Sequence, residues 1–327
     1  MEFGFALFGI EPAKVRDLAQ TAEALNFDLI LFPDHIVIES PERQYDPHAL
    51  SFDSITMATL AAGATKRIKV GHLVLCNQFR HPIITAQSLM TLDHASGGRM
   101  LLGLGAGWTQ TEFDMTGLPF PPIRERLEAL DESLTCIRSL WTNERTTFEG
   151  KHYRFRDAIL WPKPVQKHPP IILGGSGKGL LRIAAKHADY LNIIPDAGKA
   201  GKISIDRLRQ MNDEVFRERV DFFRAEARRI GRDPDAIKIS NALLVFMVVD
   251  TEAAARQMIE GIASAFNVSP EVLLASPVMM VGTPEYCAAE LRRRAKNWGV
   301  TQFVFSSFLG MDEKQIRRVR EEVIPQI

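Results

Sequence analysis

The sequence is poor in cysteine and carries no net charge, and both features limit what the protein can be. Only three cysteines occur among 327 residues, at Cys76, Cys136 and Cys287. An odd number at such wide spacing fits neither a disulfide framework nor a CxxC metal site, so we expect a reducing, cytoplasmic environment and no metal. Forty Lys and Arg residues balance forty Asp and Glu residues. No overall field therefore attracts nucleic acid or an anionic membrane.

Long hydrophobic runs are also missing. No stretch of eighteen consecutive apolar residues occurs, and the first residues lack the basic and then apolar pattern of a secretory signal. Apolar residues nevertheless make up 46% of the chain and charged residues 24%, which is typical of a folded globular protein. We therefore expect a small-molecule substrate and neither a nucleic-acid nor a membrane partner.

Short β-prone runs alternate with amphipathic segments of helix length along the chain. Strands are expected at 3–8, 28–32, 68–75, 100–104, 171–173, 189–194, 237–249 and 303–306. Helices are expected at 12–26, 52–64, 83–94, 124–141, 180–187, 204–230, 252–266, 284–297 and 313–323, and an inserted hairpin at 146–161. Such alternation predicts a parallel sheet with helical crossovers.

Eight strand-helix units predict an α/β fold of one domain over 1–327, a TIM (β/α)8 barrel with insertions in its βα loops. The alternative is an open doubly wound sheet, which usually carries a glycine-rich fingerprint in its first strand-helix turn. Here that turn reads Gly9-Ile10-Glu11-Pro12. The barrel is therefore the favoured fold.

In such a barrel the carboxyl ends of the strands form the catalytic face, so polar residues there carry most weight. The second expected strand ends in Pro33-Asp34-His35. This places an imidazole and a carboxylate at the mouth, and a histidine there can hydrogen-bond or transfer a proton near neutral pH. An ordinary loop histidine is the alternative that the residues leave open.

Two glycine-rich runs follow later strands. Gly103-Leu104-Gly105-Ala106-Gly107-Trp108 has alternate glycines, which suit either a planar ligand close to the backbone or tight barrel packing. It is not a dinucleotide fingerprint, because Trp108 stands where the last glycine would be. Gly174-Gly175-Ser176-Gly177-Lys178-Gly179 precedes an expected helix, so its backbone N–H groups, Ser176 and Lys178 predict a phosphate site, with a plain flexible loop as the alternative.

Several motifs in a fixed order carry a family resemblance. They are Phe32-Pro33-Asp34-His35, Gly71-His72-Leu73-Val74-Leu75, Arg80-His81-Pro82, Thr91-Leu92-Asp93, Ser96-Gly97-Gly98-Arg99, the run from Gly103 to Trp108, Glu112-Phe113, the run from Pro170 to Gly177, Ala185-Lys186-His187-Ala188-Asp189 and Gly282-Thr283-Pro284-Glu285. Together they resemble the bacterial luciferase-like superfamily of flavin- and deazaflavin-dependent TIM-barrel oxidoreductases. The resemblance covers nearly the whole chain.

The resemblance implies a cofactor ring across the carboxyl ends of the strands, stacked against the third strand. A non-prolyl cis peptide would lie behind the ring at Leu73-Val74. By the same resemblance, Asp34 and either Cys76 or Asn77 would border the ring, and the turn at Ala106-Gly107, with Trp108 beside it, would flank the tail. Gly174, Gly175, Ser176 and Gly177 would hold the phosphate.

Members of this family that use coenzyme F420 have a histidine at the position of His35, and some have an acidic proton donor directly after the Gly-x-Gly-x-Gly run. This sequence has Trp108 there, which argues against a sugar-phosphate dehydrogenase. Glu112 is nearby and is a second candidate catalytic residue. The loops 37–51, 109–122 and 266–281 are expected to shape the substrate pocket.

The resemblance therefore predicts an F420-dependent oxidoreductase that transfers a hydride between the deazaflavin and a small organic substrate. One alternative is an FMNH2-dependent luciferase-like monooxygenase that uses O2. A second alternative is a flavin-binding protein without turnover. Because members of the family are often dimers, we also expect a homodimer.

Overall fold

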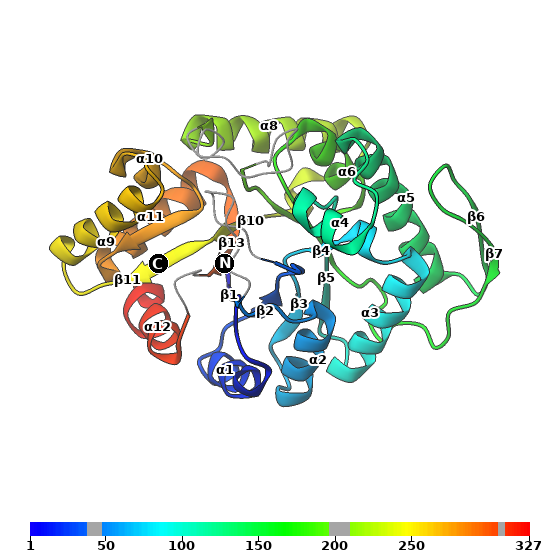
Figure 1. Ribbon diagram of the computed structural model, residues 1–327, viewed down its shortest axis with the longest axis horizontal. Coiled ribbons are helices and arrows are strands. Elements are labelled where there is room, and N and C mark those ends of the chain that lie inside the picture. The colour runs from blue at the N-terminus through cyan, green and yellow to red at the C-terminus, as the bar shows by residue number, and fades with distance from the viewer. Residues whose placement is uncertain (38–47, 196–209, 307–310) are drawn as a thin grey trace.

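The chain forms a closed barrel of parallel strands in the computed structural model, which describes residues 1–37, 48–195, 210–306 and 311–327 (Figure 1). The barrel strands are β1 (Glu2–Ala6), β2 (Leu29–Phe32), β3 (Lys69–His72) continued by β4 (Leu75–Cys76), β5 (Met100–Gly105), β8 (Ile171–Gly174), β9 (Tyr190–Asn192), β10 (Lys238–Leu243) and β13 (Val300–Phe305). Each pairs in parallel with the next, and β13 closes the ring on β1. The predicted TIM barrel is confirmed.

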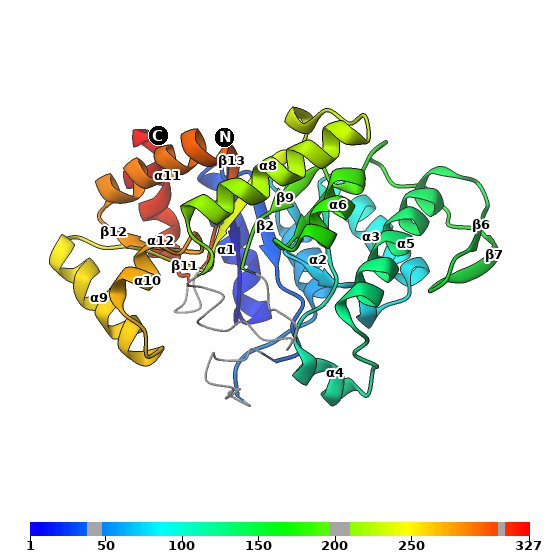
Figure 2. The same cartoon turned by 90° about the horizontal axis from the view of Figure 1, so that it is seen from above.

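Helices surround the barrel on its outside (Figures 1 and 2). They are α1 (Pro12–Ala24), α2 (Ser54–Ala64), α3 (Pro82–Ser96), α5 (Ile123–Thr142), α6 (Lys178–His187), α8 (Asp213–Arg229), α11 (Pro284–Trp298) and α12 (Glu313–Arg318), the last continued by a π-helical turn at Val319–Val323. Helix α5 shows why they pack there. Its Leu130, Leu134 and Ile137 recur at helical spacing and are fully buried, so one stripe of the helix covers the sheet.

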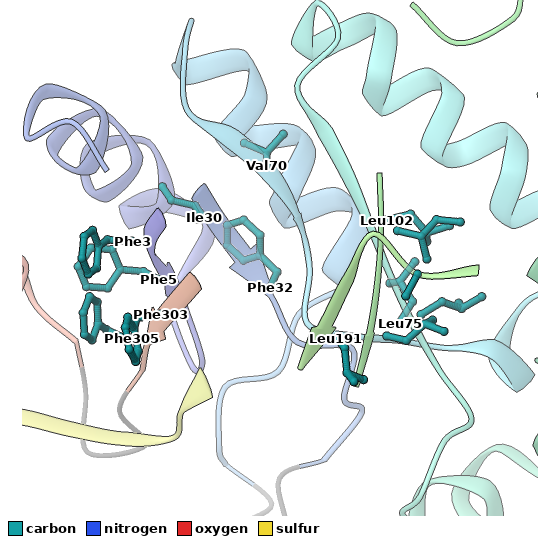
Figure 3. Close-up of a cluster of buried hydrophobic side chains, with 14 of the residues drawn as sticks. Phe3, Phe5, Ile30, Phe32, Val70, Leu75, Leu102, Leu191, Phe303 and Phe305 are labelled. Atoms are coloured by element: carbon teal, nitrogen blue, oxygen red, sulfur yellow. The ribbon is translucent and has the colours of Figure 1, made fainter. Parts of the chain in front are cut away.

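Side chains of the strands divide between two cores. Those facing outward pack under the helices, and Figure 3 shows Phe3, Phe5, Phe303 and Phe305 grouped there on β1 and β13. The alternate residues fill the inside of the barrel, where Leu29, Leu31, Leu101, Ile172 and Val304 form a separate cluster. The barrel is therefore filled by side chains, as TIM barrels are.

The amino ends of the strands are closed by a charged network around Glu2. Glu2 Oε1 accepts hydrogen bonds from Lys69 Nζ at 2.9 Å and Lys238 Nζ at 2.8 Å. Its Oε2 accepts from Gln302 Nε2 at 3.0 Å. These four residues come from β1, β3, β10 and β13, so the network links strands on several sides of the barrel.

The predicted strand 237–249 is wrong in one respect. It bends at Leu244, and β11 (Val245–Val248) leaves the barrel to pair in parallel with β12 (Met279–Gly282). The connecting helices α9 (Glu252–Ala265) and α10 (Pro270–Leu274) bury their apolar faces against this small sheet. The predicted strand divides into β10 and β11 because β11 has its own hydrophobic partners outside the barrel.

Three other segments differ from prediction or add to it. The expected helix 204–230 begins later, because Asn212 has an extended backbone and caps α8 by accepting a hydrogen bond from Val215 N at 3.0 Å. Residues 204–209 lie outside the described residues. The expected loop 109–122 contains helix α4 (Gln110–Thr116), and 266–281 contains α10 and the start of β12. The inserted hairpin is confirmed as β6 (Thr146–Glu149) and β7 (Arg154–Ala158).

Candidate active site

The third barrel strand is interrupted where the resemblance places the cofactor ring. A cis peptide joins Leu73 and Val74, between the end of β3 and the start of β4, as expected. A methyl group at Gly105 would lie 2.7 Å from Val74 Cγ2, and one at Gly174 would lie 3.6 Å from Val74 Cγ1. Val74 therefore sits between two glycines on neighbouring strands and forms an apolar floor at the mouth of the barrel.

The alternate glycines of β5 have distinct roles. A methyl group at Gly103 would lie 1.9 Å from His72 O, so this glycine permits close strand packing. Gly107 has φ +70°, and a methyl group there would lie 2.7 Å from Cys76 Sγ. This φ favours glycine. Tight packing therefore explains Gly103, and a tight turn after β5 explains Gly107. The planar ligand stays a prediction.

His35 and Glu112, far apart in the sequence, meet at this mouth. His35 Nδ1 lies 3.1 Å from Glu112 Oε1, which also accepts from Ile36 N at 2.7 Å. Glu112 is buried in the first turn of α4, and Figure 2 shows α4 at the end of the molecule opposite the N terminus. Because a carboxylate only accepts hydrogen bonds, Nδ1 carries the proton and Nε2 is left for proton exchange.

The remaining neighbours of His35 hold it in place. Its ring makes an edge contact with Trp108, with 5.5 Å between ring centroids. Ser51 Oγ donates a hydrogen bond to the backbone carbonyl of His35. A mainly apolar pocket lies beside it, lined by Leu7, Gly9, Ile10, Phe32, Pro33, His35, Leu50, Ser51, Phe52 and Met57. His35 is therefore held by Glu112, Trp108 and Ser51 beside a small apolar cavity, and its catalytic role stays a prediction.

Asp34 is buried and held by donors of this chain. Its carboxylate accepts from Cys76 N at 2.9 Å and from both terminal nitrogens of Arg80, at 2.7 and 3.0 Å. The sequence arguments matched Arg80 to the family but gave it no role. Asp34 is therefore a structural anchor of the turn after β4, and its contact with a cofactor ring stays a prediction.

Asn77 is fixed by the inserted hairpin. Asn77 Nδ2 donates to Tyr153 OH at 3.0 Å, and Tyr153 lies in the hairpin turn. Glu132 of α5 holds that turn by accepting from the backbone of Lys151, His152 and Tyr153, at 2.8 to 3.1 Å. The hairpin thus braces the segment that follows β4.

The predicted phosphate loop lies at the start of α6. Gly175 has φ +142° and donates to Asn192 O at 2.9 Å, Ser176 is buried, and Gly177 is the N-cap residue. A methyl group at Gly177 would meet nothing within 4 Å, so the backbone there is open to a ligand. Lys178 is exposed, and its Nζ lies 3.8 Å from Glu218 of α8. The anion role predicted for Ser176 and Lys178 stays a prediction.

These features share one end of the barrel. Strands β2, β3 with β4, β5 and β8 are consecutive in the sheet, so His35, Val74, Ala106-Gly107 and Ser176 follow neighbouring carboxyl ends. The residues fit a flat, phosphate-tailed group, because the floor at Val74 and the open loop at Gly177 lie at the same mouth. In the described ranges, no cluster of three or more His, Cys, Asp or Glu residues could hold a metal. Within the same residues, no helix is long and apolar enough to cross a membrane.

A family model described as luciferase-like monooxygenase matches residues 3–219, more than half of the chain. The chain belongs to this luciferase-like family. An F420-dependent glucose-6-phosphate dehydrogenase of Nakamurella multipartita is 36% identical over 198 residues, which cover 60% of this chain and 56% of that protein. The chain spans less than two thirds of the length of the first curated relatives that it matches.

Solved structures of luciferase-like proteins share the fold over nearly the whole chain. An F420-dependent secondary alcohol dehydrogenase, in complex with an F420-acetone adduct, has a TM-score of 0.81 at 21% identity, covering 99% of this chain and 98% of that one. A long-chain alkane monooxygenase has a TM-score of 0.78 at 17% identity, covering 100% and 90%. At these identities the comparison supports the fold alone.

Proposed function

We propose that the protein is an oxidoreductase that transfers a hydride between coenzyme F420 and a small organic substrate. The observation that carries this proposal is the His35–Glu112 pair, because it holds an imidazole at the end of β2, and the glycine-lined floor at Val74 follows the neighbouring strand β3. The 36% identity to an F420-dependent dehydrogenase supports the choice of coenzyme. The bound coenzyme would supply the hydride chemistry.

The residues of the chain would bind, orient and move a proton. Val74 would support the ring, Ala106-Gly107 would flank it, and the backbone of 174–177 with Ser176 would bind a phosphate. His35 would exchange a proton with the substrate at Nε2, while Glu112 holds Nδ1–H and fixes the ring. A positioned acid-base group of this kind contributes about 10²- to 10⁴-fold to a rate.

The substrate that we propose is not a sugar phosphate, although the relative in Nakamurella acts on one by name. Trp108 occupies the position at which some members have an acidic proton donor. The small cavity beside His35 is lined mainly by apolar side chains, which favours contact there with an apolar group of the substrate.

The test is a side-by-side titration of the apoprotein with F420 and with FMN. We expect saturable binding of F420 and weaker binding of FMN. The rival function is an FMNH2-dependent monooxygenase, which the match to a family model described as luciferase-like monooxygenase favours. Oxygen consumption coupled to FMNH2 turnover, without F420 binding, would establish the rival.

The variant His35→Ala distinguishes the proposed enzyme from the second alternative, a flavin-binding protein without turnover. We expect this variant to keep the coenzyme affinity of the wild type and to lose about 100-fold or more in hydride transfer. A wild-type protein that binds F420 and reduces or oxidises no alcohol or carbonyl compound in a broad panel would favour the alternative.

We also propose that the protein is a homodimer through α2 and α3. Residues 54–64 and 82–92 contain no Asp, Glu, Lys or Arg, although Leu60 is 44% and Ile84 is 51% exposed on this face. An uncharged surface with small side chains suits packing against its own copy. We expect Leu60→Glu to give a monomer in sedimentation experiments. Leu274→Glu on the distant α10, where Leu274 is similarly exposed at 50%, should leave the dimer intact. A wild-type monomer at micromolar concentration would refute this.

A cytoplasmic location is part of the same proposal. All three cysteines are free and buried, which suits a reducing compartment.

A further inference from the structure

Arg80 joins two carboxylates at the mouth of the barrel. It lies between the turn after β4 and helix α3, and its guanidinium contacts Asp34 through two bonds of 2.7 and 3.0 Å. Its Nη2 also donates to Asp53 Oδ2 at 3.0 Å. The Arg80 side chain is 19% exposed and that of Asp34 only 6%. The forked geometry is one that arginine provides and lysine does not.

The two carboxylates hold separate parts of the site. Asp34 Oδ2 accepts from Cys76 N at 2.9 Å, so it fixes the end of β4. Asp53 caps α2 by accepting from Thr56 N at 2.8 Å. One guanidinium therefore connects the end of β2, the end of β4 and the start of α2. We call Arg80, Asp34 and Asp53 the arginine clamp.

The arginine clamp lies next in sequence to both sides of the proposed reaction site. His35 follows Asp34 directly, and Asn77 follows Cys76. The backbone that carries the proton-transferring imidazole is thereby tied to the backbone that continues from the Val74 floor. Ser54 of α2 also links the ends of β2 and β3, because its Oγ donates to Phe32 O at 3.0 Å and lies 2.9 Å from His72 Nδ1. The arginine clamp adds the link to the end of β4.

We propose that Arg80 is a positioning residue for hydride transfer, because it fixes the distance between His35 and the Val74 floor. This inference rests on the proposed function. Without Arg80 the two carboxylates would face each other unneutralised, and their repulsion would move the ends of β2 and α2 apart. A displacement of about 1 Å between reacting groups can cost roughly 100-fold in rate.

The test compares Arg80→Gln and Arg80→Lys with a matched control, Arg138→Gln. Arg138 is 20% exposed and pairs with Asp189 at 2.9 Å, and its Nη1 donates to Pro169 O at 2.7 Å. It joins the amino ends of β8 and β9, at the opposite end of the barrel from the site. The control thus removes a similar arginine pair without touching the mouth.

Hydrogen exchange measured by mass spectrometry is the first readout, and it needs no coenzyme. We expect Arg80→Gln to accelerate exchange in peptides covering 33–37 and 73–77, and Arg138→Gln to leave these peptides unchanged. Equal exchange in both variants would overturn the clamp itself, whatever the function of the protein.

The second readout is kcat/KM, with the coenzyme that the wild type binds in the titration above. We expect a loss of about 100-fold for Arg80→Gln, an intermediate loss for Arg80→Lys, which keeps the charge without the fork, and less than threefold for Arg138→Gln. If exchange rises at the mouth while kcat/KM stays within threefold of the wild type, the clamp is structural and the positioning role is refuted. If the wild type binds neither F420 nor FMN, the proposed function and the positioning role both fail, whereas the exchange result still decides whether the clamp exists.

Discussion

Replacing Glu2 by Gln should destabilise the barrel without affecting the mouth. Burial acts to raise the pKa of Glu2, but hydrogen bonds from Lys238, Lys69 and Gln302 and the attraction of the Lys69 charge outweigh it, so the pKa falls from 4.5 to about 2. The Glu2 side chain is 16% exposed, so solvent screens these interactions little. A decrease of this size corresponds to about 3 kcal/mol of stability at neutral pH.

The sign of the pH dependence follows from the lowered pKa. The folded state holds the ionised form of Glu2 more strongly than the unfolded state does, so this contribution is complete above about pH 5. It is lost as the pH falls from there towards 2. Glu2→Gln should therefore lower the free energy of unfolding by about 3 kcal/mol at pH 7 and by much less at pH 3.

The assay is urea unfolding of both proteins at pH 7 and at pH 3, with a thermal scan at pH 7. For a chain of this length, about 3 kcal/mol corresponds to a decrease in Tm of about 4 °C. Coenzyme affinity and kcat should stay at wild-type values, because the amino ends of barrel strands serve stability and the carboxyl ends serve catalysis. A variant that is as stable as the wild type at pH 7, or that loses coenzyme affinity, would refute this reasoning.

Two further predictions concern the mouth. Glu112→Gln should lower kcat by about 10- to 100-fold, because the neutral amide no longer fixes the His35 tautomer through a charge-assisted bond. Steady-state kinetics give kcat, and a value equal to that of the wild type would contradict a role of Glu112 in holding His35. Gly107→Ala should weaken coenzyme binding about tenfold or more in a fluorescence titration, because φ is +70° and the new methyl group would lie 2.7 Å from Cys76 Sγ. An unchanged Kd would show that the turn after β5 does not flank the coenzyme.

Local patterns predicted most of the barrel. Alternating strand and helix segments predicted the eight barrel strands, and the polar residues at their ends placed His35 and Ser176 at one face. The strand 237–249 shows the limit of this approach. Its continuous β-prone run gives no sign of a division at Leu244, because the division depends on the partner strand β12, over thirty residues later.

The clamp and the hairpin contact show the same limit for the site. Arg80 belongs to a motif that resembles the family, but its pairing with Asp34 joins residues 46 positions apart, and no sequence spacing predicts it. Tyr153 reaches Asn77 from an insertion 76 positions away. Glu112 was predicted as a site residue, and the structure adds that it holds His35 and the backbone of Ile36.

A crystal structure of the protein with bound F420 would decide whether this mouth of the barrel is the coenzyme site. We expect the deazaflavin ring against Val74, its reactive carbon on the side of His35, and the phosphate on the backbone of 175–177 with Ser176. A ring bound at the other end of the barrel, or a phosphate away from this loop, would contradict this expectation.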